Sequence, residues 1–105
     1  MSKSPTITED ERLEEIHPGD LVKTEFVEAA GLTVSALSEA TGISPETLDA
    51  FLDGHVSVSV DIDMRLGHYF RMSPGFFLGL QNDYDMRVWQ RAHASELDRY
   101  PPRAA

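Results

Sequence analysis

The stretch that decides the fold is residues 32–54, which read LTVSALSEATGISPETLDAFLDG. Thr33 and Ser44 are residue types that cap the first turn of a helix, and a proline and an acid follow Ser44 as they do in many first turns. Gly42 supplies a turn between the two segments. Apolar residues recur at helical spacing on both sides of it. The stretch therefore predicts helix, glycine turn and helix over residues 33–53, the layout of a helix-turn-helix.

Three further helices are expected around this stretch. The first opens at His17-Pro18-Gly19-Asp20, where a proline and an acid occupy the first turn. The second begins at the capping candidate Ser59, after an alternating run (residues 56–60) that is too short for a strand and is expected to be an extended connector. The third and longest begins with the cap and proline of Ser73-Pro74 and runs to about Ala92.

The expected fold is all-α, a compact bundle of five helices that contains the helix-turn-helix. Gly67 lies inside one expected helix at a cost of about 1 kcal/mol relative to alanine, which indicates close approach of a neighbouring helix. We expect three parts along the chain: an acidic N-terminal leader over residues 1–16, the helical domain over residues 17–92, and a C-terminal tail over residues 93–105.

The composition favours a soluble cytoplasmic protein and excludes several classes of site. The chain has 105 residues, enough for one domain, and no cysteine, which rules out disulfides and thiolate metal sites. No segment approaches the roughly 20 apolar residues that a membrane-spanning helix requires. The histidines are scattered without i, i+4 pairing, so neither a metal nor a cofactor is expected. With no supported Ser-His-Asp order and no phosphate loop, the chain is expected not to be an enzyme.

The charge of the chain conflicts with the usual chemistry of DNA binding. The formal net charge is −9, whereas contacts to phosphate normally come from a basic surface. No lysine or arginine lies between Lys23 and Arg65, and residues 17–80 hold nine acidic residues against three basic ones, a net charge of −6. Such a surface favours a basic protein partner instead.

Three segments, in this order and spacing, resemble the HigA/VapI antitoxin family, a branch of the lambda-repressor-like helix-turn-helix proteins. They are His17-Pro18-Gly19-Asp20, the helix-turn-helix from Leu32 to Gly54, and the run SPGFFLGLQNDYD over residues 73–85. The resemblance implies a five-helix fold, a homodimer, binding of operator DNA by the second helix of the helix-turn-helix, and neutralisation of a HigB-type toxin. Toxins of that type are small basic ribonucleases that cut messenger RNA on the ribosome.

Seven residues are candidates for contact with DNA. Hydroxyls and helix amides can donate to phosphates or base edges, a lysine or a protonated histidine can contact phosphate, and a glutamate can accept from the cytosine amino group. The seven are Lys23, Thr33, Ser35, Ser44, Glu46, Thr47 and His55. Capping alone explains Thr33 and Ser44 equally well, and a solvated first-turn acid explains Glu46.

The last expected helix carries more apolar surface than a bundle of this size buries, which predicts a homodimer. The residues expected at the dimer interface are Phe77, Leu78, Tyr84 and Trp89. Two functions stay open. One is an antitoxin-type transcriptional regulator that binds operator DNA as a dimer and neutralises a HigB-type toxin. The other is an acidic protein-interaction module that keeps the fold but has lost specific DNA binding, because Asp49 and Asp53 repel phosphates.

Overall fold

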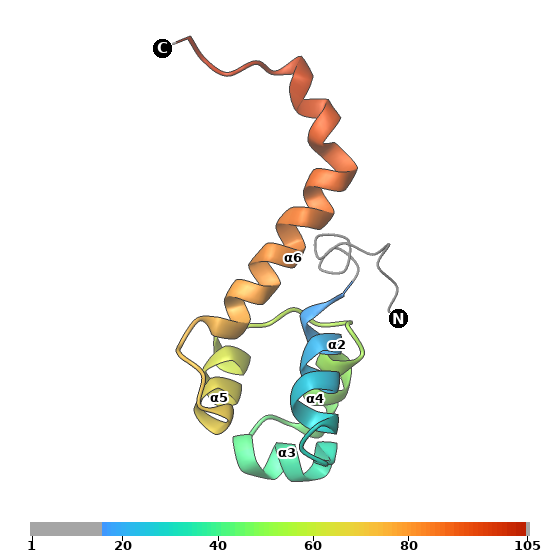
Figure 1. Cartoon of the computed structure of the whole chain (residues 1–105), viewed down its shortest axis with the longest axis vertical. Coiled ribbons are helices and arrows are strands. Elements are labelled where there is room, and N and C mark those ends of the chain that lie inside the picture. Colours follow the sequence, from blue (N-terminus) through green and yellow to red (C-terminus); the bar gives the residue numbers. More distant parts are fainter. Residues whose placement is uncertain (1–15, 105) are drawn as a thin grey trace, which may run out of the picture.

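The computed structural model describes residues 16–104, which are helical and contain no strand. The elements in chain order are α2 (Pro18–Val22), the π-helical η1 (Lys23–Glu28), α3 (Val34–Thr41), α4 (Pro45–Leu52), α5 (Val60–Phe70), α6 (Phe76–His93) and the 3-10 helix η2 (Ala94–Arg99). Figure 1 shows α2 to α5 gathered into a body, from which α6 rises and carries the C-terminus away. The all-α expectation is confirmed. The acidic leader, apart from Ile16, lies outside the described residues.

One hydrophobic core joins all the helices of the body to the start of α6. Its members come from each element between α2 and α6, and Phe51, Phe77, Leu37, Leu48 and Leu66 are among those with almost no exposed surface. The full set is Val22, Val27, Leu37, Ile43, Leu48, Phe51, Leu52, Val58, Ile62, Leu66 and Phe77. Burying each large side chain is worth about 1.5–3 kcal/mol, so this cluster is the main term that holds the short helices together.

The first helix begins where the sequence predicts, and its first residues fix it to α4. The Nδ1 atom of His17 accepts a hydrogen bond from the Gly19 amide at 2.8 Å and so caps the helix. A Cβ atom on Gly19 would overlap the carbonyl oxygen of Phe51 in α4. The His17 ring also lies edge-on to Tyr84 of α6, with ring centroids 5.1 Å apart. The His-Pro-Gly opening therefore places α2 against both α4 and α6.

The start of α6 differs from the expectation that Ser73 caps it. The cap position is Gly75, in the left-handed region with φ 92°, and it makes no side-chain cap of its own. Asp63 of α5, only 1% exposed, accepts instead from the amides of Gly75 at 2.7 Å, Phe77 at 2.8 Å and Leu78 at 3.0 Å. A carboxylate from a neighbouring helix thus satisfies the free amides and the positive end of α6.

The connector before α5 is free of helix and strand over residues 57–59, as expected, and the buried Val58 amide donates to Oε1 of Gln81 at 2.9 Å. Gly67 was expected to face a neighbouring helix. A Cβ there would instead stand 3.2 Å from the carbonyl oxygen of Met72, in the loop that turns back after α5. The glycine therefore makes room for the chain's own return, which is a correction of the predicted neighbour.

Candidate nucleic-acid interface

The α3 and α4 helices form the predicted helix-turn-helix, and hydrogen bonds fix the turn between them. Gly42 adopts the left-handed region with φ 79°, and its amide donates to the carbonyl of Ser38 at 2.8 Å. The Ser38 hydroxyl donates to the carbonyl of Ile43 at 2.6 Å, and the Thr41 hydroxyl accepts from the Ile43 amide at 3.2 Å. Because the Ile43 side chain is buried, these bonds anchor the turn to the core.

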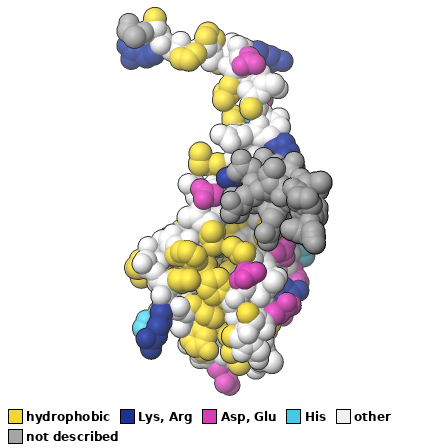
Figure 2. All heavy atoms as spheres, in the orientation of Figure 1, with side chains coloured by type: hydrophobic (Ala, Val, Ile, Leu, Met, Phe, Trp, Pro, Cys, Tyr) yellow, Lys and Arg dark blue, Asp and Glu magenta, His cyan; other side chains and the backbone are white. Residues whose placement is uncertain are grey.

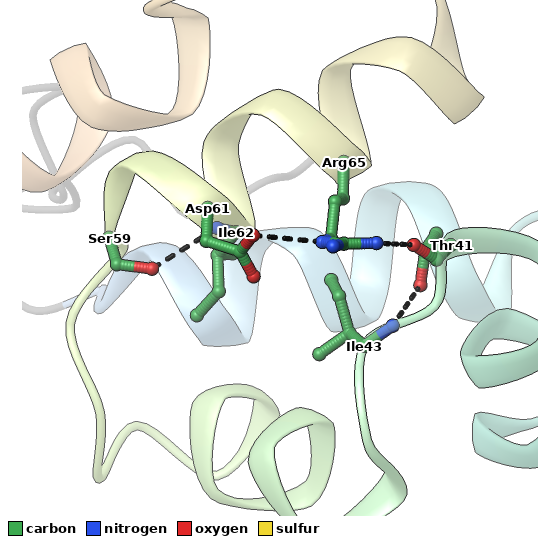
Figure 3. Close-up of polar contacts among 6 residues, drawn as sticks. All are labelled: Thr41, Ile43, Ser59, Asp61, Ile62 and Arg65. Carbon is green, nitrogen blue, oxygen red and sulfur yellow. Dashed lines mark hydrogen bonds and ion pairs between the residues drawn. The ribbon is translucent and has the colours of Figure 1, made fainter.

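A side chain from α5 also holds this turn (Figure 3). The Nη1 atom of Arg65 donates to the carbonyl of Thr41 at 2.9 Å, and its Nε donates to Asp61 at 2.9 Å. The Thr41 carbonyl belongs to the last turn of α3, where carbonyls lack helical partners and a positive charge is favourable. A Cβ on Gly42 would stand 2.6 Å from Nη1, so this glycine also leaves room for the guanidinium.

Neither the role of Arg65, which holds this turn, nor that of Asp63, which caps α6, is predicted from the sequence. For Arg65, the one available signal is its i, i+4 spacing from Asp61, which permits an ion pair on one helix face. That spacing gives no information on the carbonyl of Thr41, which lies 24 residues away in sequence. Asp63 carries no comparable signal, since a first-turn acid is ordinary on a solvated helix.

Capping places two of the seven DNA-contact candidates at the first turns of the helix-turn-helix. The Thr33 hydroxyl accepts from the Ala36 amide at 3.0 Å, and the Ser44 hydroxyl accepts from the Thr47 amide at 3.2 Å. The hydroxyls of Ser44 and Thr47 are also 2.9 Å apart and hydrogen-bonded. Both cap residues are exposed, so they stand at the solvent-facing starts of α3 and α4.

The remaining candidates differ in exposure and position. Ser35 and Glu46 are exposed in the first turns of α3 and α4, while the Thr47 side chain is half-buried. His55 is exposed in the loop after α4, and Lys23 is exposed on η1, outside the helix-turn-helix. The structure therefore gathers five of the seven at two helix starts and leaves Lys23 and His55 apart. Contact of these residues with DNA stays a prediction.

The outer surface of α4 is acidic. Glu46, Asp49 and Asp53 are all exposed on this helix and its C-terminal cap. The nearest arginine in sequence, Arg65, is already paired with Asp61. In Figure 2 acidic side chains lie on the right side and at the bottom of a hydrophobic area on the body, and Lys and Arg side chains lie on the protruding C-terminal part and at the edges of the body. Carboxylates on α4 itself would lie within a Debye length of about 8 Å of bound phosphates and escape screening.

Comparison with known proteins places this arrangement in a family, although no family model matches the sequence. Virulence-associated protein I of Dichelobacter nodosus is 29% identical over 73 residues, which cover 70% of this chain and 68% of that protein. Antitoxin HigA-1 of Vibrio cholerae is 31% identical over 68 residues, 65% of this chain and 64% of that protein.

Two solved structures extend the match to nearly the whole of the compared chains. The Pseudomonas aeruginosa antitoxin HigA with the higBA promoter has a TM-score of 0.78 at 27% identity, covering 86% of this chain and 98% of that one. The antitoxin GraA in complex with its operator has a TM-score of 0.78 at 31% identity, covering 86% and 91%. The chain belongs to the HigA/VapI antitoxin family. The resemblance predicted from its three sequence segments is thereby confirmed.

In this HigA/VapI-type chain, the four residues expected at the dimer interface have different surroundings. Phe77 is fully buried in its own chain, with its ring 5.5 Å from that of Phe26, so it offers no surface to a second copy in this conformation. Leu78 and Tyr84 are half-buried. Trp89 is 45% exposed on the protruding part of α6.

The exposed apolar surface continues beyond Trp89. The large hydrophobic residues exposed on α6 and the segment after it are Phe76, Met86, Val88, Trp89, Leu97 and Tyr100. Across residues 16–104, no group of three or more His, Cys, Asp or Glu side chains is arranged to hold a metal ion. No helix in the same range is long and apolar enough to cross a membrane.

Proposed function

We propose that this HigA/VapI-type chain is a transcriptional regulator that binds operator DNA as a homodimer and, as an antitoxin, neutralises a basic HigB-type toxin. The observation that carries the proposal is the helix-turn-helix, whose two first turns present exposed hydroxyls at Thr33 and Ser44. The structural relatives solved with the higBA promoter and with an operator support the DNA-binding part.

DNA binding in this proposal depends on hydrogen bonds more than on charge. Hydroxyls and amides at the starts of α3 and α4 donate to phosphates, which fixes the position of the protein on the duplex. Glu46, in the first turn of α4, accepts from a cytosine amino group in the major groove. Because few cations are released from DNA by this surface, we expect a shallow dependence of affinity on salt.

The homodimer is proposed from the unpartnered apolar surface of α6. Leu78, Tyr84 and Trp89 form the part of the expected interface that keeps exposed surface, and Phe76 adds a ring that is 39% exposed. A two-fold axis at this helix would present two copies of α4 to the DNA, about 34 Å apart in the usual arrangement of helix-turn-helix dimers.

The acidic body supports the antitoxin part of the proposal. Exposed carboxylates on α4 and elsewhere would accelerate encounter with a basic ribonuclease and complement its surface. The same surface favours a second candidate function, an acidic protein-interaction module that has lost specific DNA binding. What supports that alternative is the exposure of Glu46, Asp49 and Asp53 on the one helix that would enter the groove.

A gel-shift assay separates the two functions. The full chain is mixed with DNA from its own promoter and with a scrambled duplex of equal length, each with and without the toxin encoded beside it. A shift of the promoter fragment without toxin, with no shift of the scrambled duplex, supports the regulator. A shift of the promoter fragment that appears only with toxin supports a regulator that binds DNA as the toxin–antitoxin complex. No shift in any lane would refute DNA binding, and sedimentation of the same samples then shows whether the toxin complex and the dimer form.

A further inference from the structure

We propose that Arg65 is a positioning residue for operator binding, which from α5 holds the turn between α3 and α4 and so fixes the angle at which α4 meets DNA. The inference rests on the proposed function, because it assigns a role in that function to a residue outside the helix-turn-helix. It differs from the seven candidates above, since Arg65 acts through the Thr41 carbonyl and not through contact with DNA.

The geometry of the guanidinium carries the proposal. Nη1 donates to the carbonyl of Thr41, the last residue of α3, and Nε donates to Asp61 one turn earlier on α5. The other bonds of the turn come from Ser38 and Thr41, within the helix-turn-helix itself. Among the described hydrogen bonds of this turn, the Arg65 contact is therefore the one that ties it to a different helix.

The site fits arginine specifically. A planar guanidinium presents several N–H groups in fixed directions and can bond a carbonyl and a carboxylate at the same time, which a lysine ammonium on a flexible stem does poorly. Gly42 adds to the fit, because a Cβ atom there would collide with Nη1 at 2.6 Å. The residue at the turn and the residue on α5 are thus matched in shape.

The exposure of this pair allows the role to be tested in a folded protein. The side chains of Arg65 and Asp61 are 46% and 68% exposed, and exposed ion pairs contribute little to the free energy of unfolding. We therefore expect substitutions here to leave the fold intact. The same exposure makes direct contact of Arg65 with a phosphate the alternative that the experiment must distinguish.

The experiment measures operator dissociation constants by fluorescence anisotropy over a series of salt concentrations. The full-length variants are Arg65→Gln, Arg65→Lys and Asp61→Asn, with Arg71→Gln as the control that removes one arginine from the end of the same helix. We expect Arg65→Gln and Arg65→Lys to weaken binding by about fivefold, the loss expected for one net hydrogen bond. The salt slope should stay that of the wild type, and Arg71→Gln should not reproduce the loss.

Asp61→Asn gives the sharpest discrimination. If Arg65 positions the turn, loss of its Asp61 partner weakens operator binding, and Asp61→Asn adds little in an Arg65→Gln background. If Arg65 contacts phosphate, Asp61→Asn frees it and strengthens binding, Arg65→Lys binds like the wild type, and Arg65→Gln lowers the salt slope by about 0.9. Any of these three results overturns the proposal.

Amide hydrogen exchange provides a readout that does not require DNA. Loss of the Arg65 contact should speed exchange of the Gly42 and Ile43 amides, both of which are bonded within the turn, and Arg71→Gln should leave it unchanged. Unchanged exchange in Arg65→Gln overturns the inference whatever the DNA result. If the wild-type protein binds no operator, the proposed DNA binding and the positioning role of Arg65 are both refuted. The exchange rates then still decide whether Arg65 holds the turn.

Discussion

Replacing Asp63 by alanine should destabilise the protein more than any other change of a single carboxylate in the described chain. Asp63 is buried at 1% exposure, and its two oxygens accept from the amides of Gly75, Phe77 and Leu78 at 2.7 to 3.0 Å. Alanine removes both acceptor oxygens and with them all three hydrogen bonds. Water has little access to the vacated position, because Phe77 is itself fully buried.

The size of the effect follows from these contacts. A hydrogen bond to a charged group is worth about 1.5–3 kcal/mol, and a buried amide left without a partner costs about 1–3 kcal/mol. Simple addition of three such bonds would overestimate the loss of stability, because the desolvation of the buried carboxylate offsets part of what the bonds contribute. We expect Asp63→Ala to lower the free energy of unfolding by about 3–5 kcal/mol, a large part of the roughly 5–15 kcal/mol of a typical domain.

Urea unfolding followed by circular dichroism at 222 nm measures this loss. The matched control is Asp61→Ala, which removes an acid from the same first turn of α5 but is 68% exposed in its side chain and should cost at most about 1 kcal/mol. Asp63→Asn should fall between the two, because its amide keeps one acceptor oxygen and turns a donor toward another donor. A loss below about 1 kcal/mol in Asp63→Ala would refute the capping role.

Four other changes test separate parts of the structure. Burial lowers the pKa of His17 below its ordinary value of 6.5. The stability that the neutral ring contributes is therefore complete above pH 6.5 and is lost as the pH falls through the lowered pKa. Urea unfolding midpoints measured between about pH 8 and about pH 5 should fall on acidification, and they should fall less in His17→Asn. Gly19→Ala should cost about 3 kcal/mol in the same assay, because the new Cβ overlaps the α4 backbone. Glu46→Lys combined with Asp49→Lys should tighten non-specific DNA binding and steepen its salt dependence in anisotropy titrations. If the double variant instead forms the toxin complex more slowly and more weakly, with no increase in DNA affinity, the result favours the protein-interaction module. Trp89→Ala should shift sedimentation toward the monomer. A variant that sediments as the wild type does would show that Trp89 does not belong to a dimer interface.

The parts of the fold that the sequence predicts are those with local causes. A cap residue bonds an amide three positions later, so Thr33, Ser44 and Ser59 could be assigned from neighbouring residues alone, and the structure confirms each cap. The left-handed turn at Gly42 is equally local, since glycine enters that region of φ at no steric cost.

The parts that sequence reasoning missed depend on packing between distant segments. Asp63 reaches amides 12 to 15 residues away, and Arg65 reaches a carbonyl 24 residues away. Neither distance can be inferred before the angles between helices are known. The same reason explains Phe77, which sits beside exposed Phe76 in sequence but points into the core. Helical periodicity alone does not say which of two adjacent rings faces inward.

The helix α5 links α6 to the helix-turn-helix through two side chains. Asp63 and Arg65 stand two positions apart, and each satisfies the free terminus of a different helix: the amino end of α6 and the carboxyl end of α3. The eleven residues of α5 thus connect the start of α6 to the last turn of α3 in the helix-turn-helix. If the proposed function holds, a protein partner that tilts α6 would displace α5 and with it the turn beside α4, so binding of that partner would change the affinity for DNA without any contact between the two ligands.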